Sequence, residues 1–466
     1  MPFKTIDETD LQTFQQMVGP EHVLLPHAEN ESYTHDHTEN LRFVPEVILR
    51  PADAAQISDI MRYCHEHSIC VTPRGAGTGL SGGALAVMGG VLLSLERLNR
   101  ILDIDSSNFQ VTVEPGVINE TLQQAVIAQG LFYPPDPASK GSCFLGGNIA
   151  HASGGPRALK YGTTRDYVLN LEIVLPSGEI LWTGANTLKY STGYNLTHLV
   201  IGSEGTLAIV TKIVLKLIAY PPKNMLLLAS FTDPEKACAA VAGIFKAGCQ
   251  PSVCEFVEPE AFRLSSEFTG LAFDIPDNIG AYLLIEADGF DEEAIMQECE
   301  KISQVLETFE CTNTMLAYSS DQKEFLWRLR RCIGEATKHG NIYKEEDTVV
   351  PRACLPQLFR GVKEIAQRYG VRTVCYGHAG DGNLHVNMLK DELSDEFWQT
   401  DIKGAIREIF ELCKQLHGTI SGEHGIGFVQ KEFMPIVMQD INLELMRRIK
   451  TAFDPKGILN PGKIIM

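Results

Sequence analysis

The sequence predicts a mixed α/β (α+β) protein built from two successive α/β regions. Short apolar strands alternate with amphipathic helices along most of the chain, and short turns rich in glycine and proline separate them. The length supports the same prediction, because 466 residues suffice for two or three domains with sizeable cores. Residues 219–224, AYPPKN, have the composition of a linker between the two regions.

The first region is expected to open with a helix and a polar stretch within residues 1–45, and to end near residue 218. Its strands are predicted from short apolar runs and its helices from longer amphipathic segments. The predicted strands are residues 47–51, 69–73, 91–95, 111–116, 171–178, 179–184 and 205–217. The predicted helices are residues 53–67 and 118–130.

The second region repeats the alternation. Its predicted strands are residues 225–231, 252–257, 281–288 and 311–320, followed by a glycine-rich hairpin over residues 372–389. Its predicted helices are residues 234–248, 292–309, 323–340, 355–370 and 406–418. The tail, residues 453–464, is rich in turn-forming residues, and we expect it to be ordered.

The composition excludes several classes of protein. Forty lysines and arginines against 59 aspartates and glutamates give a formal charge of −19, whereas a nucleic-acid binder needs a concentrated basic face. No apolar run approaches the roughly 18 to 20 residues of a membrane-spanning helix. The acidic start, MPFKTIDETDL, is neither a signal peptide nor a transit peptide. We therefore expect a cytoplasmic protein with no nucleic-acid partner and no transmembrane segment.

The twelve cysteines are scattered and never form a Cys-x-x-Cys pair, so the chain is not expected to hold its own iron–sulfur cluster. A disulfide framework is not expected in a chain this long without a secretory signal. We predict that most of the cysteines are buried apolar thiols. His35 and His37 form a His-x-His pair in a polar stretch, which we interpret as a solvated loop rather than a metal site.

The first glycine cluster spans residues 73–83, PRGAGTGLSGG. Successive glycines permit positive φ and let backbone N–H groups point into one concavity, which suits a pyrophosphate. Gly77, Gly79 and Gly82 also match the dinucleotide fingerprint G-x-G-x-x-G. That motif requires a long helix directly afterwards, but Gly89-Gly90 and a predicted strand interrupt the chain here, which argues against it.

Two further clusters lie at residues 135–162 and 202–207. Backbone that passes close to a large flat ligand at several points would need this distribution of glycine. Three tight turns without a ligand are the structural alternative.

At these motifs the chain closely resembles a known family. PRGAGTGLSGG, VEPGV, LGGNIA, KYG and GSEGTLAIVT, in this order, resemble the FAD-binding (PCMH-type) domain of the vanillyl-alcohol-oxidase-type flavoproteins. The whole chain resembles the glycolate oxidase catalytic subunit and the D-lactate and D-2-hydroxyglutarate dehydrogenases. The resemblance implies a two-part FAD-binding domain at residues 1–218 with its core at about 42–218, a substrate-binding cap at 219–424, and a C-terminal segment, 425–466, that returns to the FAD domain.

The resemblance also implies which residues hold FAD. They are Arg74, Gly75, Ala76, Gly77, Thr78, Ser81 and Gly82 at the pyrophosphate, Pro115, Gly116, Asp136, Gly146, Gly147, Asn148 and Gly154 along the ribityl and flavin path, Gly205 and Ile209 near the adenine, and Asn460 from the tail. Relatives with covalent flavin often have histidine where Thr78 stands, so non-covalent FAD is expected; a bond from Cys143 to the flavin is the less favoured alternative. The family usually has asparagine where this chain has Ala152.

A polar constellation follows in the second region. On the strand after the hairpin turn, His385 and Asn387 alternate with apolar residues and therefore share a face, and His378 ends the preceding strand. The loop SGEHGIG adds Glu423 and His424. Two histidines and one glutamate suit a catalytic Zn²⁺ or similar ion. The resemblance implies that His378, His385 and Glu423 are metal ligands and His424 the catalytic base.

Cations that would bind substrate are the remaining candidates. Arg330 lies on a predicted helix, and its planar guanidinium suits bidentate capture of a carboxylate, although arginines on a helix also form solvated faces. The resemblance implies a substrate-side role for Arg330 and for Lys344. Gly334 stands where the diacid-oxidising relatives place a hydroxyl residue, which weakens the expectation of a diacid substrate.

These features predict an FAD-dependent 2-hydroxy-acid dehydrogenase acting on D-lactate, glycolate or D-2-hydroxyglutarate. Electrons would leave through an external acceptor: an iron–sulfur subunit, an electron-transfer flavoprotein or a quinone. A homodimer is compatible with the sequence. The alternatives are another flavoenzyme chemistry on the same fold, a His/His/Glu metal-dependent hydrolase, and a non-catalytic FAD-holding subunit.

Overall fold

The computed structural model describes residues 3–465 and confirms the mixed α/β class. The chain divides into two compact units. The first unit comprises the chain up to residue 154, residues 162–220 and the chain from residue 423 onward. The second unit comprises residues 155–161 and 221–422. One crossing between the units falls within the predicted linker, whereas the short excursion at 155–161 was not anticipated.

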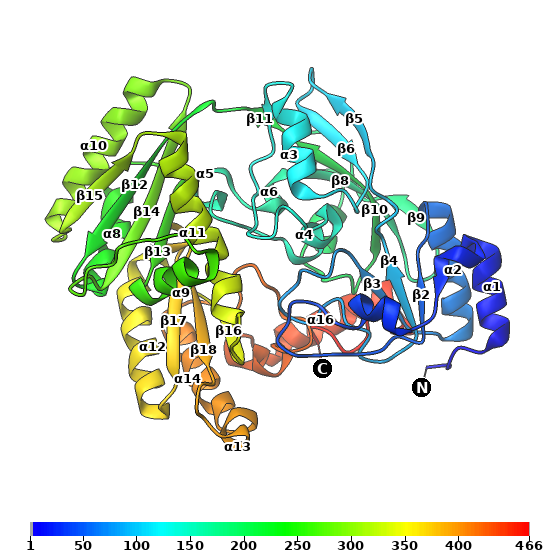
Figure 1. Cartoon of the computed structure of the whole chain (residues 1–466). Helices are drawn as coiled ribbons and strands as arrows, with labels where there is room; N and C mark the ends of the chain where they lie inside the picture. Colours follow the sequence, from blue (N-terminus) through cyan, green and yellow to red (C-terminus); the bar gives the residue numbers. More distant parts are fainter. Residues whose placement is uncertain (1–2, 466) are drawn as a thin grey trace. The chain divides into compact units, whose positions relative to one another are not determined.

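The first unit contains two main sheets (Figure 1). One has the order β1-β2-β4-β3, with β1 Val23–Leu24, β2 Val47–Leu49, β4 Val91–Ser94 and β3 Val71–Arg74. The other has the order β5-β6-β10-β8-β9, with β5 Ile101–Asp105, β6 Gln110–Val113, β10 Ile209–Lys216, β8 Val168–Val174 and β9 Ile180–Trp182. A small pair joins β7 Leu131–Phe132 to β11 Ile218–Ala219.

The helices of this unit are mostly short. They are α1 Glu8–Val18, α2 Ala54–His67, α3 Asn119–Ile127, α4 Leu145–His151, α6 Thr164–Tyr167, α7 Leu196–Val200, α15 Met434–Val437 and α16 Asp440–Phe453. Helix α2 starts where the Asp53 side chain accepts from the Gln56 N–H, and it buries Ile57, Ile60 and Met61 in the core beneath β2 and β4.

The C-terminal tail is ordered, as predicted, and it pairs with β3. The Val71 N–H donates to the Ile458 carbonyl (2.8 Å), and the Asn460 N–H donates to the Val71 carbonyl (2.7 Å). The amide of Asn460 donates to the carbonyls of Gly83 (3.0 Å) and Glu204 (2.8 Å). The tail therefore fixes the backbone of two glycine-rich loops.

The second unit is built on one antiparallel sheet with the order β15-β12-β14-β13-β17-β18-β16. Its strands are β12 Lys223–Phe231, β13 Val253–Val257, β14 Ala281–Gly289, β15 Asn313–Ala317, β16 Tyr343–Val349, β17 Arg372–Gly377 and β18 Asn383–Leu389. Its helices are α5 Ala158–Tyr161, α8 Pro234–Lys246, α9 Pro259–Thr269, α10 Glu292–Thr308, α11 Ser320–Lys338, α12 Leu355–Tyr369, α13 Asp395–Gln399 and α14 Ile402–Gln415.

The two faces of this sheet carry different helices (Figure 1). Helices α9 and α11 pack on the face that presents Val257, Leu284 and Val374. On the opposite face Phe256 of β13 meets Phe359 of α12, with ring centroids 5.3 Å apart. Because side chains alternate along a strand, each residue of β16, β17 and β18 can be assigned to one face.

Ala152 ends helix α4 in the left-handed conformation, with φ 52°. A side chain other than asparagine or glycine is strained there. We expect Ala152→Asn to raise the free energy of unfolding by about 0.5–1 kcal/mol. Ala150→Gly, inside the same helix, should instead lower it by about 0.5–1 kcal/mol. Denaturant unfolding of both variants checks this, and a destabilised Ala152→Asn would contradict it.

Candidate active site

Three side chains on one face of helix α11 bind glutamates of the sheet in the second unit. Trp327 donates through Nε1 to Glu286 (3.0 Å), and Lys338 pairs with Glu345 (2.8 Å). Between them the Arg330 guanidinium binds Glu255. Residues three and four apart on a helix share a face, so the spacing of this row follows from helical geometry.

Glu255 holds two of the predicted site residues together. Its carboxylate is fully buried, binds Arg330 through one oxygen, and accepts from the His378 Nδ1 through the other (2.8 Å). Burial alone would raise the pKa of Glu255, but Arg330 and His378 offset this and hold its pKa below the ordinary value. The carboxylate thus fixes the orientation of both a guanidinium and an imidazole.

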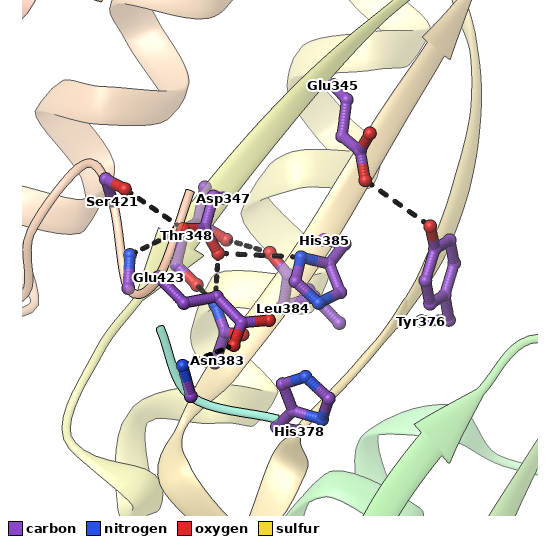
Figure 2. A network of polar contacts seen from close by, with 12 residues as sticks. Glu345, Asp347, Thr348, Tyr376, His378, Asn383, Leu384, His385, Ser421 and Glu423 are labelled. Carbon is purple, nitrogen blue, oxygen red and sulfur yellow. Dashed lines mark hydrogen bonds and ion pairs between the residues drawn. The ribbon is translucent and has the colours of Figure 1, made fainter. Parts of the chain in front are cut away.

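The second histidine is placed in the same manner. The His385 Nδ1 lies 3.5 Å from Asp347, whose carboxylate also accepts from Asn383 (2.8 Å), Ser421 (3.0 Å) and the Gly422 N–H (2.7 Å). Figure 2 shows Asp347 between the Ser421 turn and the His385 ring. Asp347 therefore both orients His385 and anchors the start of the SGEHGIG loop to β16.

The two imidazoles lie close together, with ring centroids 5.3 Å apart and planes at 86°. As predicted, the hairpin brings them to one face of the sheet, which they share with Asn387 and Tyr376. With Nδ1 of each ring beside a carboxylate, Nε2 is the nitrogen that an ion would bind.

Buried side-chain atoms of Asn387 and Arg330 at this face make no regular hydrogen bond to the described residues. The Asn387 side chain is fully buried; it interacts with the Tyr376 hydroxyl, but neither its oxygen nor its nitrogen makes a hydrogen bond of regular geometry to the described residues. The Nε of Arg330 is likewise buried without a partner. Buried polar groups are nearly always hydrogen-bonded, so these atoms indicate a polar ligand at this face.

Lys344 does not lie on the sheet face that carries His385 and Asn387. On β16 it stands opposite Met388, whereas Glu345 stands opposite Asn387. Strand alternation therefore puts Glu345, not Lys344, on the face that carries His385 and Asn387. The Glu345 carboxylate approaches the Tyr376 hydroxyl (3.4 Å; Figure 2), and burial together with Glu345 raises the pKa of Tyr376 well above its ordinary value.

Glu423 and His424 follow Gly422 directly in the chain and belong to the first unit. Within that unit the Glu423 carboxylate accepts from the Gly154 N–H (3.1 Å). The carboxylate of buried Glu204 accepts from the backbone N–H groups of Ile426 and Gly427, both at 2.7 Å. Glu204 thus fixes the turn that carries His424.

Contacts within the first unit explain part of the first glycine cluster, residues 73–83. The Arg74 side chain donates to the carbonyls of Ser32 (2.9 Å) and His35 (2.8 Å), so the polar stretch around His35 is tied to this loop. A Cβ on Gly77, whose φ is 74°, would strike the Arg74 guanidinium. The Gly82 N–H already donates to the Thr38 hydroxyl (2.6 Å), which differs from its expected use at a pyrophosphate.

Close packing explains three other glycines. A Cβ on Gly116 would lie 2.6 Å from the Leu95 carbonyl, one on Gly146 2.6 Å from Pro115, and one on Gly205 2.7 Å from Pro73. Ile209 lies in the apolar core of the first unit, and the Asn148 amide donates to Asn119 (3.1 Å), so the side chains of both serve the fold. Thr78, Gly75 and Ala76 lie in the loop after β3, and Asp136 is buried.

Two features of the same loops suit a bound cofactor. A Cβ on Gly147 would meet no described atom within 4 Å, so the backbone there borders open space. The Ser81 hydroxyl is buried without a hydrogen-bond partner among the described residues. A glycine facing open space and an unsatisfied hydroxyl fit a ligand that approaches the backbone closely. Cys143 is buried, and burial raises the pKa of its thiol.

Sequence reasoning missed the residues that orient the site. They are Glu255, Lys338, Glu345, Asp347 and Tyr376. A signal was available, because Glu255 interrupts an otherwise apolar strand and a charge in a central strand requires a buried partner.

Comparison with known proteins identifies the family. Residues 45–184 match the model of an FAD binding domain, and residues 220–464 match the C-terminal domain of FAD linked oxidases. The chain is 37% identical over 452 residues to glycolate oxidase subunit GlcD of Bacillus subtilis, covering 96% of this chain and 95% of that protein. It is 36% identical over 453 residues to D-lactate dehydrogenase of Anaerostipes hadrus, covering 96% and 95%.

Two further comparisons agree. The chain is 34% identical over 483 residues to mitochondrial D-2-hydroxyglutarate dehydrogenase of Bos taurus, covering 100% of this chain and 85% of that protein. The structure of p-cresol methylhydroxylase shares its fold, with a TM-score of 0.80 at 17% identity, covering 98% and 96%. Across residues 3–465, no helix has both the length and the apolar character needed to cross a bilayer. The chain is an FAD-dependent oxidoreductase and belongs to the family of FAD-linked oxidases.

Proposed function

We propose that this enzyme is a dehydrogenase that oxidises a small D-2-hydroxy acid to the 2-oxo acid. One observation carries the proposal: two adjacent histidines, each with Nδ1 beside a buried carboxylate, share a sheet face with a buried arginine and an unsatisfied amide. Such a face offers groups for a hydroxyl and for a carboxylate at once. The names of the relatives, glycolate oxidase and D-lactate dehydrogenase, point to the same substrate class.

The C1 carboxylate of the substrate would bind at Arg330 and Asn387. The Nε of Arg330 and the amide of Asn387 are among the buried polar atoms without a regular hydrogen bond to the described residues, and a carboxylate would satisfy both. Because Glu255 already neutralises the guanidinium, the interaction would depend on directed hydrogen bonds more than on net charge.

A divalent ion, with Zn²⁺ the best match to the donor set, would be held by His378, His385 and Glu423. The carboxylates of Glu255 and Asp347 at the Nδ1 atoms are the partners that metal-bound histidines usually have. When bound, such an ion supplies Lewis acidity that lowers the pKa of the substrate hydroxyl.

His424 would accept the proton of that hydroxyl, because an imidazole nitrogen can act as a general base. The glycine-rich loops of the first unit would hold FAD, which would supply two-electron redox chemistry for the oxidation at C2. The protein contributes the orientation of substrate and base.

Electrons would then pass to an external acceptor, such as an iron–sulfur subunit, an electron-transfer flavoprotein or a quinone. This proposal follows from the sequence, because the twelve cysteines form no Cys-x-x-Cys pair that would indicate an iron–sulfur centre in the chain itself.

The direct test is anaerobic reduction of the bound flavin. We expect its absorbance to bleach with glycolate or with D-lactate, and not with L-lactate. Incubation with a chelator should slow bleaching at least tenfold, and added Zn²⁺ should restore it. If no D-2-hydroxy acid bleaches the flavin, the proposed function is wrong; if the chelator has no effect while metal analysis finds no bound ion, only the metal is wrong.

A further inference from the structure

We call the sheet face that carries His385 and Asn387 the substrate face. At the edge strand β16 this face carries a largely buried ion pair. Lys338, at the end of α11, binds Glu345 at 2.8 Å, and their side chains are 20% and 8% exposed. Glu345 stands opposite Asn387 and lies 3.4 Å from the Tyr376 hydroxyl. A carboxylate is therefore fixed one strand away from the amide proposed to hold substrate.

Both cations that α11 directs onto this face are already paired. Arg330 is bound to Glu255 and Lys338 to Glu345. In this inference the substrate chain beyond C2 extends from Arg330 along this face towards β16. There it would meet Tyr376 and Glu345, so a second carboxylate would face a like charge, and the neighbouring cation, Lys338, is already paired with Glu345.

Lys344 does not supply that cation. It stands opposite Met388, on the sheet face away from Asn387, whereas Glu345 occupies the position that faces the substrate. Gly334 also adds no side chain to this region: a Cβ there would already lie 3.3 Å from the Tyr376 hydroxyl.

We propose that Glu345, held by Lys338, is a specificity-determining residue that rejects a second carboxylate, so that the substrate is a 2-hydroxy monocarboxylate with a short uncharged side chain. This inference rests on the proposed function. It differs from that function in predicting which member of the 2-hydroxy acid class is used.

The test compares D-lactate with D-2-hydroxyglutarate on the FAD-loaded enzyme. We expect kcat/KM for the monoacid to exceed that for the diacid by at least about 100-fold. In Glu345→Gln this ratio should fall at least tenfold, because the repelling charge is removed and Lys338 is released. In Lys338→Met the ratio should rise, because Glu345 loses its counter-ion. Opposite changes of this ratio in the two variants would show an effect on substrate selectivity, whereas a general loss of activity would lower kcat/KM for both substrates.

Glu335→Gln is the matched control, because it removes one negative charge from the exposed side of the same helix and should leave the ratio unchanged. Binding of pyruvate and 2-oxoglutarate, followed by the flavin spectrum, gives a readout independent of turnover. If no acid is oxidised but pyruvate binds more tightly and Glu345→Gln removes the preference, the inference stands and the proposed function falls. A diacid preferred by the wild type, or a ratio unchanged in Glu345→Gln, would overturn it.

Discussion

Replacing Glu255 by glutamine is expected to reduce kcat/KM by at least about 100-fold, because one buried carboxylate orients both Arg330 and His378. Glutamine has the same shape but no charge, so the guanidinium loses its counter-ion. Removing one partner of a buried ion pair typically costs about 3–5 kcal/mol of folding free energy. Steady-state kinetics and denaturant unfolding, with flavin content as a check of folding, measure both effects.

Glu258→Gln provides the matched control, since it lies three residues further along the chain. Glu258 pairs with Lys363 (2.7 Å) and accepts from the Cys375 N–H (2.6 Å), without contacting either histidine. We expect a loss of stability but a change in kcat/KM below about threefold. If the two variants lost activity equally, Glu255 would have a structural role and no specific part in positioning the site.

The sequence predicted the fold class well because its strands are apolar and its helices amphipathic. Helix α10, Glu292–Thr308, and helix α12, Leu355–Tyr369, lie within one residue of their predicted bounds. Strand β16 was missed because YKEEDTV is too polar to be read as a strand. Its polar side chains have partners in the fold: Glu345 and Asp347 face the candidate site, and their partners come from α11 and β18.

Helix α4, Leu145–His151, was not among the predicted helices. Its sequence LGGNIAH was interpreted as part of a glycine cluster close to a ligand, and glycine is unfavourable inside helices. The helix forms because tertiary packing outweighs that preference: a side chain on Gly146 would strike Pro115. Local helix propensity therefore could not predict α4, because Gly146 is required by its contact with Pro115 in the segment after β6.

The pairing of the two histidines was predictable from the sequence. Glu255 was recognisable as a charge in an apolar strand, but which residues it and Asp347 would bind was not predictable. Strand alternation puts His385 and Asn387 on one face from sequence alone. The partners Glu255 and Asp347 lie 123 positions from His378 and about 40 from His385, so only the fold brings them together. The face on which Lys344 lies was also not predictable, since the register of β16 against β18 fixes which side chain faces the candidate site.

Glu204→Gln is expected to reduce kcat about 10- to 100-fold while flavin content stays close to that of the wild type. The carboxylate of Glu204 accepts from two consecutive N–H groups, Ile426 and Gly427, at 2.7 Å each. A glutamine side chain has one acceptor oxygen, and its NH₂ group would face the second N–H. The turn just after His424 would therefore lose its anchor, at a cost of about 1.5–3 kcal/mol.

The backbone of Glu204 is held independently, because its carbonyl accepts from the Asn460 amide (2.8 Å) and its N–H donates to Ala150 (2.8 Å). The substitution thus affects the SGEHGIG loop selectively. Since His424 is proposed to take a proton and not to bind the carboxylate, kcat should fall while KM changes by less than about threefold. Glu172→Gln, a buried glutamate paired with Lys212 (2.9 Å) in the same unit, should lower stability without lowering kcat. Equal loss of kcat in both variants, or loss of flavin from Glu204→Gln, would refute a positioning role for Glu204.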